Sequence, residues 1–322
     1  MRKVSVFVLA AIVAAAPMAQ PALAQDKAAE VLAKMRQAVG GGRLDALKTF
    51  SLEATSARNM GERQLVTDIE LYLDLPDKFL RVDNITAPIA RTMTSGFNGD
   101  KLIVPAGMAG APGGPMVVSH DAPAGGGGMQ RMTVEVMVAG GGPRGGGPGG
   151  AAMTPEQQAM MAASAIRAQR VELSRLMLGW FGTAHPGLKA VYTYDGEAES
   201  PDGKAHIIGV KADGGFHAKL FIDQATNLPL MVTHQAPEPI RLQNVGRAGG
   251  AALTREEIQK RIEEARKNAK MIEHRLYFAD WQEVGGIRFP HTLQRATGSD
   301  TTEEWTIAKV KVNPKIDPKK FQ

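Results

Sequence analysis

The sequence predicts an α+β protein, mainly β, built on one large antiparallel sheet with two or three helices over one face. Three observations predict this class. Stretches in which apolar and polar residues alternate recur along most of the chain, turn residues separate them, and few stretches show helical spacing. A sheet of ten or eleven strands has to bury one face, and helices are its natural cover. We therefore expect a curved sheet with helices packed on it.

The clearest strand covers residues 65–75, where Leu, Thr and Ile at the odd positions alternate with a mostly polar series at the even positions. Pro76-Asp77 and Asn98-Gly99-Asp100 are turn signals, which favours antiparallel hairpins. Similar patterns predict the other strands at 48–58, 78–86, 90–98, 188–195, 204–211, 217–223, 230–235, 274–284, 287–297 and 302–312.

Three segments have helical features. Ala28, Val31, Leu32 and Met35 recur at helical spacing before a run of three glycines. Thr154 is a good N-cap with Pro155 after it, and this helix should run to Trp180-Phe181. A capping box at Thr254 and Glu257 begins a charged helix that ends near residue 270 and has only a narrow apolar stripe.

Two insertions interrupt the strand pattern. Residues 105–150 contain 16 Gly and 6 Pro, show no period and carry little charge, so we expect a long insertion without packed structure. Residues 236–270 form a second insertion of loop and helix. We expect residues 25–322 to form a single domain around these two insertions.

The first 24 residues have the pattern of a cleavable secretory signal. Arg2 and Lys3 precede an apolar run of about a dozen residues, and Ala22-Leu23-Ala24 is a small-x-small cleavage site. The alternative is an uncleaved membrane anchor, but the run is short for a membrane span. We expect a mature protein from Gln25 in the periplasm.

The sequence offers little catalytic chemistry. Cysteine is absent, which excludes disulfides, thiolate metal sites and cysteine nucleophiles. No metalloprotease, serine-hydrolase or phosphate-loop motif occurs. No two of the seven histidines lie two or four residues apart, but five fall on predicted strands, where a metal site could assemble in space. The methionines of 105–150 leave Cu(I) binding as a further minor alternative. The carboxylate pairs Glu256-Glu257, Glu263-Glu264 and Glu303-Glu304 are interpreted as solvent-facing. We expect no enzyme activity and no cofactor.

Charge gives no sign of a nucleic-acid partner. The net charge of +5 includes Arg2 and Lys3 of the signal, and the remaining cations alternate with Asp and Glu along the chain. Nucleic-acid readers usually concentrate their basic residues on one face, with aromatic side chains among them. We expect no nucleic-acid binding.

Four segments of strand, turn and strand follow one another in a recognisable order. In order and spacing they resemble the periplasmic lipoprotein carriers of the LolA type and the wider lipoprotein-sorting superfamily, which includes LppX-like lipid binders. The segments are 71–81 (LYLDLPDKFLR), 97–102 (FNGDKL), 202–230, and 277–290 with 312–314 and 321. They cover most of the chain outside the two insertions.

The resemblance implies a half-open β-barrel whose concave side is covered by helices, with a hydrophobic cavity that takes acyl chains. It implies no cofactor, and as partners it implies lipid acyl chains or a lipoprotein, with inner- and outer-membrane sorting components. The carriers commonly place Arg before the proline of the first segment, where it helps to hold the helical lid. Leu75 stands there in this chain, so that mechanism is not carried over. The hypothesised cavity residues are Leu71, Leu73, Phe79, Trp180, Phe181, Leu220 and Trp281.

These features favour a periplasmic protein that holds the acyl chains of a lipid or lipoprotein. An interaction or scaffold module that uses the insertions on a partner protein is the main alternative. Each hypothesised cavity residue has the ordinary alternative of a core residue.

Overall fold

The computed structural model describes residues 21–60, 63–86, 90–103, 154–201, 203–237, 247–248, 251–252, 260–261, 263–265 and 267–322. Its helices are α1 (Pro21–Val39), α2 (Gly42–Asp45), α3 (Pro155–Phe181), η1 (Pro186–Leu188) and η3 (Pro318–Phe321). Its strands are β1 (Thr49–Met60), β2 (Arg63–Asp74), β3 (Lys78–Ile85), β4 (Arg91–Asn98), β5 (Lys101–Ile103), β6 (Val191–Ser200), β7 (Gly203–Ala212), β8 (Phe216–Asp223), β9 (Pro229–Pro237), β10 (Arg247–Ala248), β11 (Ala251–Ala252), β12 (Met271–Val284), β13 (Ile287–Thr297) and β14 (Asp300–Val312).

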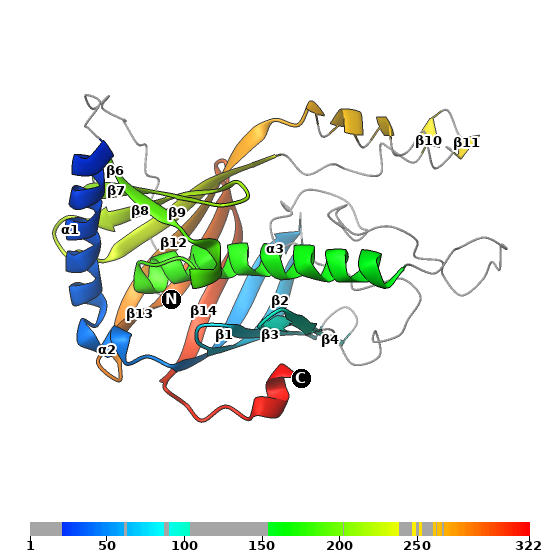
Figure 1. Cartoon of the computed structure of the whole chain (residues 1–322), viewed down its shortest axis with the longest axis horizontal. Coiled ribbons are helices and arrows are strands. Elements are labelled where there is room, and N and C mark those ends of the chain that lie inside the picture. Colours follow the sequence, from blue (N-terminus) through cyan, green and yellow to red (C-terminus); the bar gives the residue numbers. More distant parts are fainter. Residues whose placement is uncertain are drawn as a thin grey trace. The chain divides into compact units, whose positions relative to one another are not determined.

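Twelve of the strands form one sheet, in the hydrogen-bonded order β5-β4-β3-β2-β1-β14-β13-β12-β9-β8-β7-β6 (Figure 1). The sheet is unclosed, because β5 and β6 lie at its two ends. The predicted class, an open and mainly antiparallel β-structure with few helices, is confirmed. The count exceeds the predicted ten or eleven by β5, whose three residues are too short to show a periodic pattern.

The chain divides into two compact units. Unit 1 contains the described residues of Met1–Leu47, Arg170–His234 and Leu276–Thr292, and unit 2 contains those of Lys48–Gln169, Gln235–Arg275 and Leu293–Gln322. Each unit is described below by itself.

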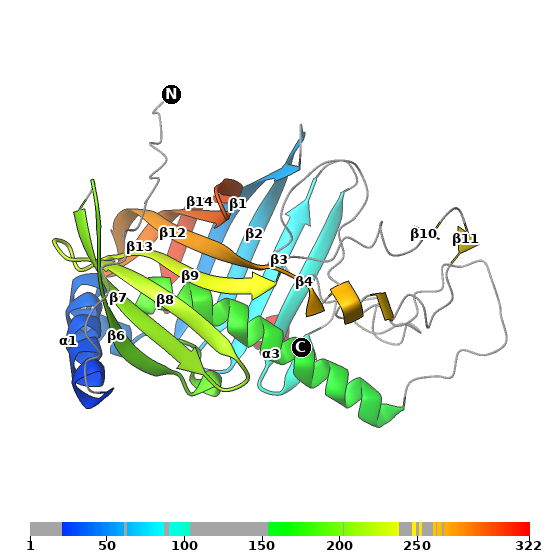
Figure 2. The same cartoon turned by 90° about the horizontal axis from the view of Figure 1, so that it is seen from above.

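In unit 1, helix α1 packs along strand β6, as Figure 2 shows. The buried stripe of α1 is Ala28, Val31, Met35 and Val39, which recur three or four residues apart and so lie on one helix face. This matches the helical spacing in the sequence. The helix continues to Val39 and then Gly41, which adopts a positive φ of 53°, turns the chain into α2.

The C-terminal part of α3 makes the closest contacts in unit 1. A Cβ atom added to Gly179 would meet the ring of Phe278 on β12, so only glycine allows this approach. Gly182, with φ +68°, places its backbone against Met35 of α1, whose Sδ would lie 2.8 Å from an added Cβ. The Phe181 ring meets that of Phe289 edge-on at 6.1 Å. Within unit 1, α1 and the C-terminal part of α3 are therefore packed tightly against their neighbours.

Strand β6 starts three residues later than the sequence predicts. Leu188 belongs to the short helix η1, which His185 caps by accepting a hydrogen bond from the Gly187 backbone N–H. Lys189 then takes a left-handed conformation, with φ 48°, which ends η1 before the strand begins. A bulge between Tyr194 and Gly196 lets the strand continue to Ser200.

In unit 2, strands β5, β4, β3, β2, β1 and β14 are antiparallel neighbours. Helix η3 packs on one face of this sheet at β3 and β4, where Phe321 packs with Leu80 and Ile103, and Tyr72 and Ile316 border the cluster. The other face of unit 2, called the apolar face below, carries the side chains of Phe50, Leu73, Phe79 and Phe97 at one end.

The predicted helix caps and insertions have different outcomes. Thr154 caps α3 as expected: its Oγ1 accepts from the Gln157 N–H at 3.2 Å, and the Gln157 Oε1 accepts from the Thr154 N–H at 3.0 Å. The 105–150 insertion lies outside the described residues. Most of the second insertion does too, although residues 260–261, 263–265 and 267 are helical.

No helix in the described part of the chain is both long enough and apolar enough to cross a membrane.

Candidate functional site

The apolar face of unit 2 is organised in rows that run across the strands. The first row joins Phe50, Leu73, Phe79 and Phe97 through direct strand pairing, and the next joins Leu52 and Leu71. All of these side chains are buried. Three of the hypothesised cavity residues, Leu71, Leu73 and Phe79, therefore lie together on one face in two adjacent rows.

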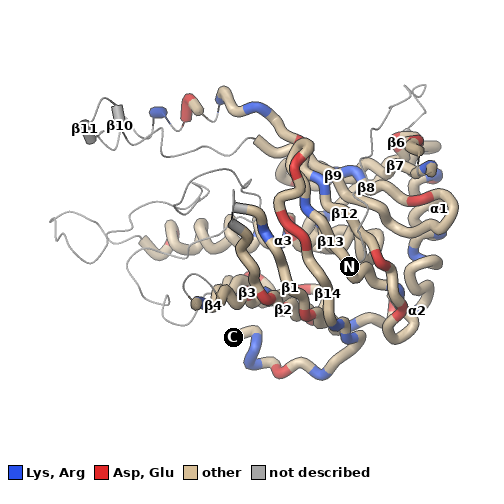
Figure 3. The backbone as a smooth tube through the Cα atoms, turned by 180° about the vertical axis from the view of Figure 1, so that it is seen from behind, with Lys and Arg blue, Asp and Glu red and all other residues tan. Residues whose placement is uncertain are grey.

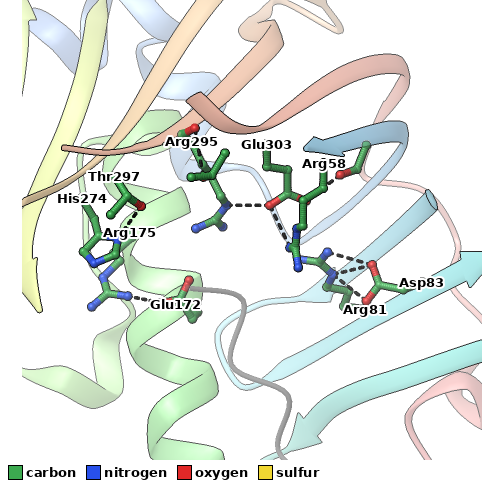
Figure 4. Close-up of polar contacts among 11 residues, drawn as sticks. Arg58, Arg81, Asp83, Glu172, Arg175, His274, Arg295, Thr297 and Glu303 are labelled. Carbon is green, nitrogen blue, oxygen red and sulfur yellow. Dashed lines mark hydrogen bonds and ion pairs between the residues drawn. The ribbon is translucent and has the colours of Figure 1, made fainter. Parts of the chain in front are cut away.

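Further along the same face the rows become polar. Arg81 pairs across β2 and β3 with Leu71, and Asp83 pairs with Ile69. On β1 the series Phe50, Leu52, Ala54 continues to Ser56 and Arg58, which pair with Trp305 and Glu303 of β14. Figure 4 shows these charged side chains converging from neighbouring strands.

Glu303 lies at the centre of this polar region. Its carboxylate accepts a hydrogen bond from Ser56 Oγ at 2.5 Å and from Arg58 Nη2 at 3.1 Å, and Arg295 Nε lies 3.5 Å away. Burial by itself would raise the pKa of Glu303. The positive charges of Arg58, Arg295 and Arg81 and the Ser56 hydrogen bond outweigh it and hold the pKa at about 2. Glu303 is therefore ionised at any physiological pH.

This finding corrects the interpretation of Glu303-Glu304 as a solvent-facing pair. Glu303 is only 3% exposed, whereas Glu304 lies on the opposite side of β14 and accepts a hydrogen bond from Gln294. Adjacent residues of a strand point to opposite faces, so one carboxylate is turned inward and its neighbour outward. The buried carboxylate is stable there because guanidinium groups surround it.

Arg81 makes the second ion pair of the region. Its Nε lies 2.9 Å from both carboxylate oxygens of Asp83, and its Nη2 lies 2.7 Å from Oδ1. Its guanidinium also lies 4.9 Å above the ring of Trp305, and that of Arg295 lies 5.9 Å from the same ring. Two guanidinium groups thus lie over the indole, an arrangement that its π-system favours.

The charges of this set do not cancel. Arg58, Arg81 and Arg295 supply three positive charges, and Asp83 and Glu303 supply two negative charges, so these five side chains sum to +1. Elsewhere in the part of the chain drawn in colour in Figure 3, basic and acidic positions are interspersed along the strands. We call these five residues, with Ser56 and Trp305, the arginine cluster.

Sequence reasoning did not identify the arginine cluster as a site, although a signal for it exists. Phe79, Arg81, Asp83 and Ile85 occupy alternate positions of one strand, so two charged residues interrupt an apolar series on the inward side. Charged residues are rare at inward positions of a strand, because a buried charge has to be paired. Their presence at such positions is therefore a signal of a polar site. The partner strands cannot be deduced from that pattern alone.

The other hypothesised cavity residues belong to unit 1. Trp180 and Phe181, at the end of α3, are buried with their rings 6.0 Å apart, and Leu220 is buried opposite Ile208. Trp281 is only partly buried on β12. The structure thus brings Trp180 and Phe181 together in the helix-packed part of unit 1.

A second polar group of unit 1 surrounds His206. The Tyr194 hydroxyl lies 3.1 Å from Glu197 Oε1 and 3.2 Å from His206 Nδ1, and Gln224 Nε2 lies 3.4 Å from the same imidazole nitrogen. Burial and the hydrogen bond to Glu197 raise the pKa of Tyr194 to about 12, and burial lowers the pKa of His206. This group borders α1, whose Lys27, Glu30 and Lys34 act on the His206 charge.

Two more polar pairs in Figure 4 are local contacts. Glu172 and Arg175 form an ion pair one turn apart on α3, and Thr297 Oγ1 lies 3.2 Å from His274 Nδ1 across neighbouring strands. Across the described residues, no group of three His, Asp or Glu side chains is arranged to hold a metal ion.

Comparison with known proteins gives structural neighbours only. No family model matches the chain, and no curated protein matches it. A LolA superfamily protein from Nitrosomonas europaea is similar over 92% of this chain and 97% of its own, at 8% identity and a TM-score of 0.47. A DUF1329 family protein from Desulfovibrio piger is similar over 93% of this chain and 97% of its own, at 8% identity and a TM-score of 0.41.

A domain described as an outer membrane lipoprotein-sorting protein, from Vibrio parahaemolyticus, is similar over 92% of this chain and 97% of its own, at 8% identity and a TM-score of 0.42. The description of the Nitrosomonas europaea protein names the superfamily that the four sequence segments resemble.

Proposed function

We propose that this protein is a periplasmic carrier that holds the acyl chains of a lipid or lipoprotein, in lipoprotein sorting or lipid transport. The observation that carries the proposal is the change of polarity along the apolar face of unit 2. That face begins with Phe50 and Leu73 and ends with Arg58 and Glu303. It therefore has the polarity pattern of an amphiphile, apolar along most of its length and charged at one end.

The apolar rows supply the binding free energy in this proposal. Each CH₂ group of an acyl chain that leaves water contributes about 0.8 kcal/mol, with no need for polar guidance. Leu71, Leu73 and Phe79 lie in adjacent rows and are buried, so a chain that displaces what now covers them gains contacts continuously. Aliphatic and aromatic surfaces of this kind accept chains of different lengths, which suits a carrier.

The proposed periplasmic localisation of the protein rests on the sequence. Residues 1–24 have the pattern of a cleavable secretory signal, so the mature protein would work outside the cytoplasm. A carrier between two membranes needs no catalytic group. The Ser56 hydroxyl does lie beside the Glu303 carboxylate, but a carboxylate whose pKa is about 2 is a poor general base. The proposed activity is therefore binding and release without chemistry.

Native mass spectrometry of the purified mature protein, followed by organic extraction, tests the proposal. We expect adducts with the masses of acyl lipids or acylated peptides, and uptake of a fluorescent fatty acid by the delipidated protein. Leu71→Ala, which shortens a side chain of the apolar face, should weaken that uptake several-fold. Val82→Ala, on the η3 side of the same strand pair, is the matched control.

A mass without adducts, together with no uptake of the fluorescent fatty acid, would overturn the carrier proposal. The interaction module would then be the better account, and its test is the loss of partner binding on deletion of residues 105–150.

A further inference from the structure

We propose that the arginine cluster of unit 2 binds the anionic group of the amphiphile, a carboxylate or a phosphate, whose chain lies on the apolar rows. The inference rests on the proposed function for the chain and adds the chemical class of the cargo. It is argued from the charge of the cluster, from the free donors of Arg58 and from the buried indole N–H of Trp305.

The charge of the cluster favours an anion. Its three guanidinium groups face two carboxylates, and Glu303 is shared between Arg58 and Arg295. Asp83 is already engaged by Arg81 on both of its oxygens. Guanidinium groups match carboxylate and phosphate oxygens in geometry, so a site with three of them suits an oxyanion.

Arg58 is the entry point for such an anion. Its Nη2 donates to Glu303, and this is its single hydrogen bond within the described part of the chain. An arginine side chain has five N–H donors, so four of them have no acceptor among the described residues. Its side chain is 24% exposed, whereas that of Glu303 is 3% exposed, so Arg58 lies where the cluster meets solvent.

Trp305 supplies a second and independent observation. Its side chain is completely buried, and its indole Nε1 has no hydrogen-bond acceptor among the residues that the structure describes. Indole N–H is a donor only, and a buried donor without an acceptor is costly. The guanidinium groups of Arg81 and Arg295 lie over this ring, so an oxyanion bound at the edge of the indole could accept from the N–H and lie near both cations.

A purely structural role for the cluster is the competing account. In that account the ion pairs fix the register of β1, β3 and β14 and bind nothing. The two accounts differ in the effect of Glu303→Gln. This variant removes a negative charge that competes with the ligand anion, so the proposal expects tighter anion binding although the fold becomes less stable. A structural role expects no gain in binding.

The test compares three ligands of equal chain length at pH 8: palmitate, hexadecyl phosphate and hexadecan-1-ol. Each displaces a fluorescent fatty alcohol from the delipidated mature protein. We expect at least one anionic ligand to bind roughly tenfold more tightly than the alcohol, because hydrogen bonds to charged groups are the strong ones. The stronger of the two anions identifies carboxylate or phosphate as the headgroup.

Three variants test which residues cause the preference for an anionic headgroup. Arg58→Gln should weaken binding of the anion several-fold more than it weakens binding of hexadecan-1-ol. Arg288→Gln, at an exposed arginine of β13 in unit 1, removes the same charge and should change nothing. Trp305→Phe keeps an aromatic ring under the two arginines but deletes the N–H, and it should also reduce the preference several-fold.

The outcomes separate this inference from the proposed function. If the alcohol binds as tightly as both anions, or if Arg58→Gln, Trp305→Phe and Glu303→Gln leave the preference unchanged, the inference is overturned and the carrier proposal stands. If none of the three ligands binds, the carrier proposal fails and the inference fails with it. Circular dichroism of each variant establishes that a lost preference is not a lost fold.

Discussion

The two units differ in the residues that they bury on the face of their strands. In unit 1, helices α1 and α3 press directly on apolar residues, and Gly179 and Gly182 bring backbone and side chains as close as atoms allow. In unit 2, the face with Phe50 and Leu73 also carries five charged side chains around Trp305. Both regions are buried, but unit 1 is closed by apolar contacts around glycine, whereas the face of unit 2 also buries charged side chains.

The contrast shows where stability and function reside in this chain. Close packing around glycine leaves no space for another molecule, so the helix contacts of unit 1 favour a structural role. Ion pairs in a buried face add little net stability compared with apolar residues of the same volume, so their presence in unit 2 favours another use. The predictions below test this division, beginning with the largest expected effect.

Gly179→Ala should destabilise the protein most. The new Cβ would overlap several atoms of the Phe278 ring, and overpacking this severe costs more than the usual upper value of about 3 kcal/mol. The higher helix propensity of alanine would return only about 1 kcal/mol. Urea denaturation of the variant measures the free energy of unfolding. Gly42→Ala is the control, because nothing lies within 4 Å of a Cβ atom added there. Equal stability of the two variants would contradict close packing in unit 1.

Acid should destabilise unit 2 through Glu303. The pKa of this carboxyl group is about 2 in the folded protein and 4.5 ordinarily, so the folded state holds its proton less tightly than the unfolded state. Its contribution is therefore complete above pH 4.5 and is lost as the pH falls towards 2. The ionised Glu303 contributes about 3 kcal/mol at most to the free energy of unfolding.

Denaturation of Glu303→Gln between pH 6 and pH 2.5 checks this expectation. The variant should be less stable at pH 6, and its stability should depend less on pH than that of the wild type. Glu304→Gln, which alters the outward neighbour, should retain the wild-type pH dependence. A wild-type pH dependence in Glu303→Gln would mean that another group causes the acid sensitivity.

Thr154→Ala should have a smaller effect, of about 1 kcal/mol. The substitution removes the capping hydrogen bond to the Gln157 N–H at the start of α3. Ser164→Ala, at an exposed position within the same helix, should be neutral or slightly stabilising. Thermal unfolding followed by circular dichroism distinguishes the two variants. A neutral Thr154→Ala would show that this end of α3 adds nothing to the stability of the fold.

The smallest effect should come from His206. Burial lowers the pKa of His206 below 6.5, so its contribution to stability is present above pH 6.5 and declines as the pH falls below that value. His206→Gln should remove this decline, whereas His217→Gln, on an exposed position of β8, should keep it. The measurement is the urea midpoint at pH 7.5 and pH 5.5, and identical midpoint shifts in both variants would exclude His206 as the cause.

Much of the fold follows from local sequence patterns. The alternation of residues 65–75 predicts β2, and Thr154 with Pro155 predicts the start of α3, because both signals lie within a few residues. Strand β6 was harder, since the left-handed Lys189 and the bulge at Gly196 depend on neighbouring chain segments. Its predicted start is therefore wrong by three residues.

The candidate site is less accessible from sequence. Leu71, Leu73 and Phe79 share a face because they belong to one hairpin, which local alternation reveals. The partners of Glu303 come from β1 and β13, and the register of β1 against β14 joins residues about 250 positions apart, which no local pattern encodes. The sequence therefore indicates which residues are apolar and inward. The charged end of the face can be identified only when the pairing of strands distant in the sequence is known.

The most direct test of the account is photolabelling of the delipidated mature protein with a palmitate analogue that carries a diazirine beside its carboxylate. If the anionic group binds at the arginine cluster, the labelled peptides should come from β1 and β14, and Arg58→Gln should reduce the labelling while Arg288→Gln does not. Labelling confined to α1 and strands β6–β8 of unit 1, or unaffected by Arg58→Gln, would contradict the account.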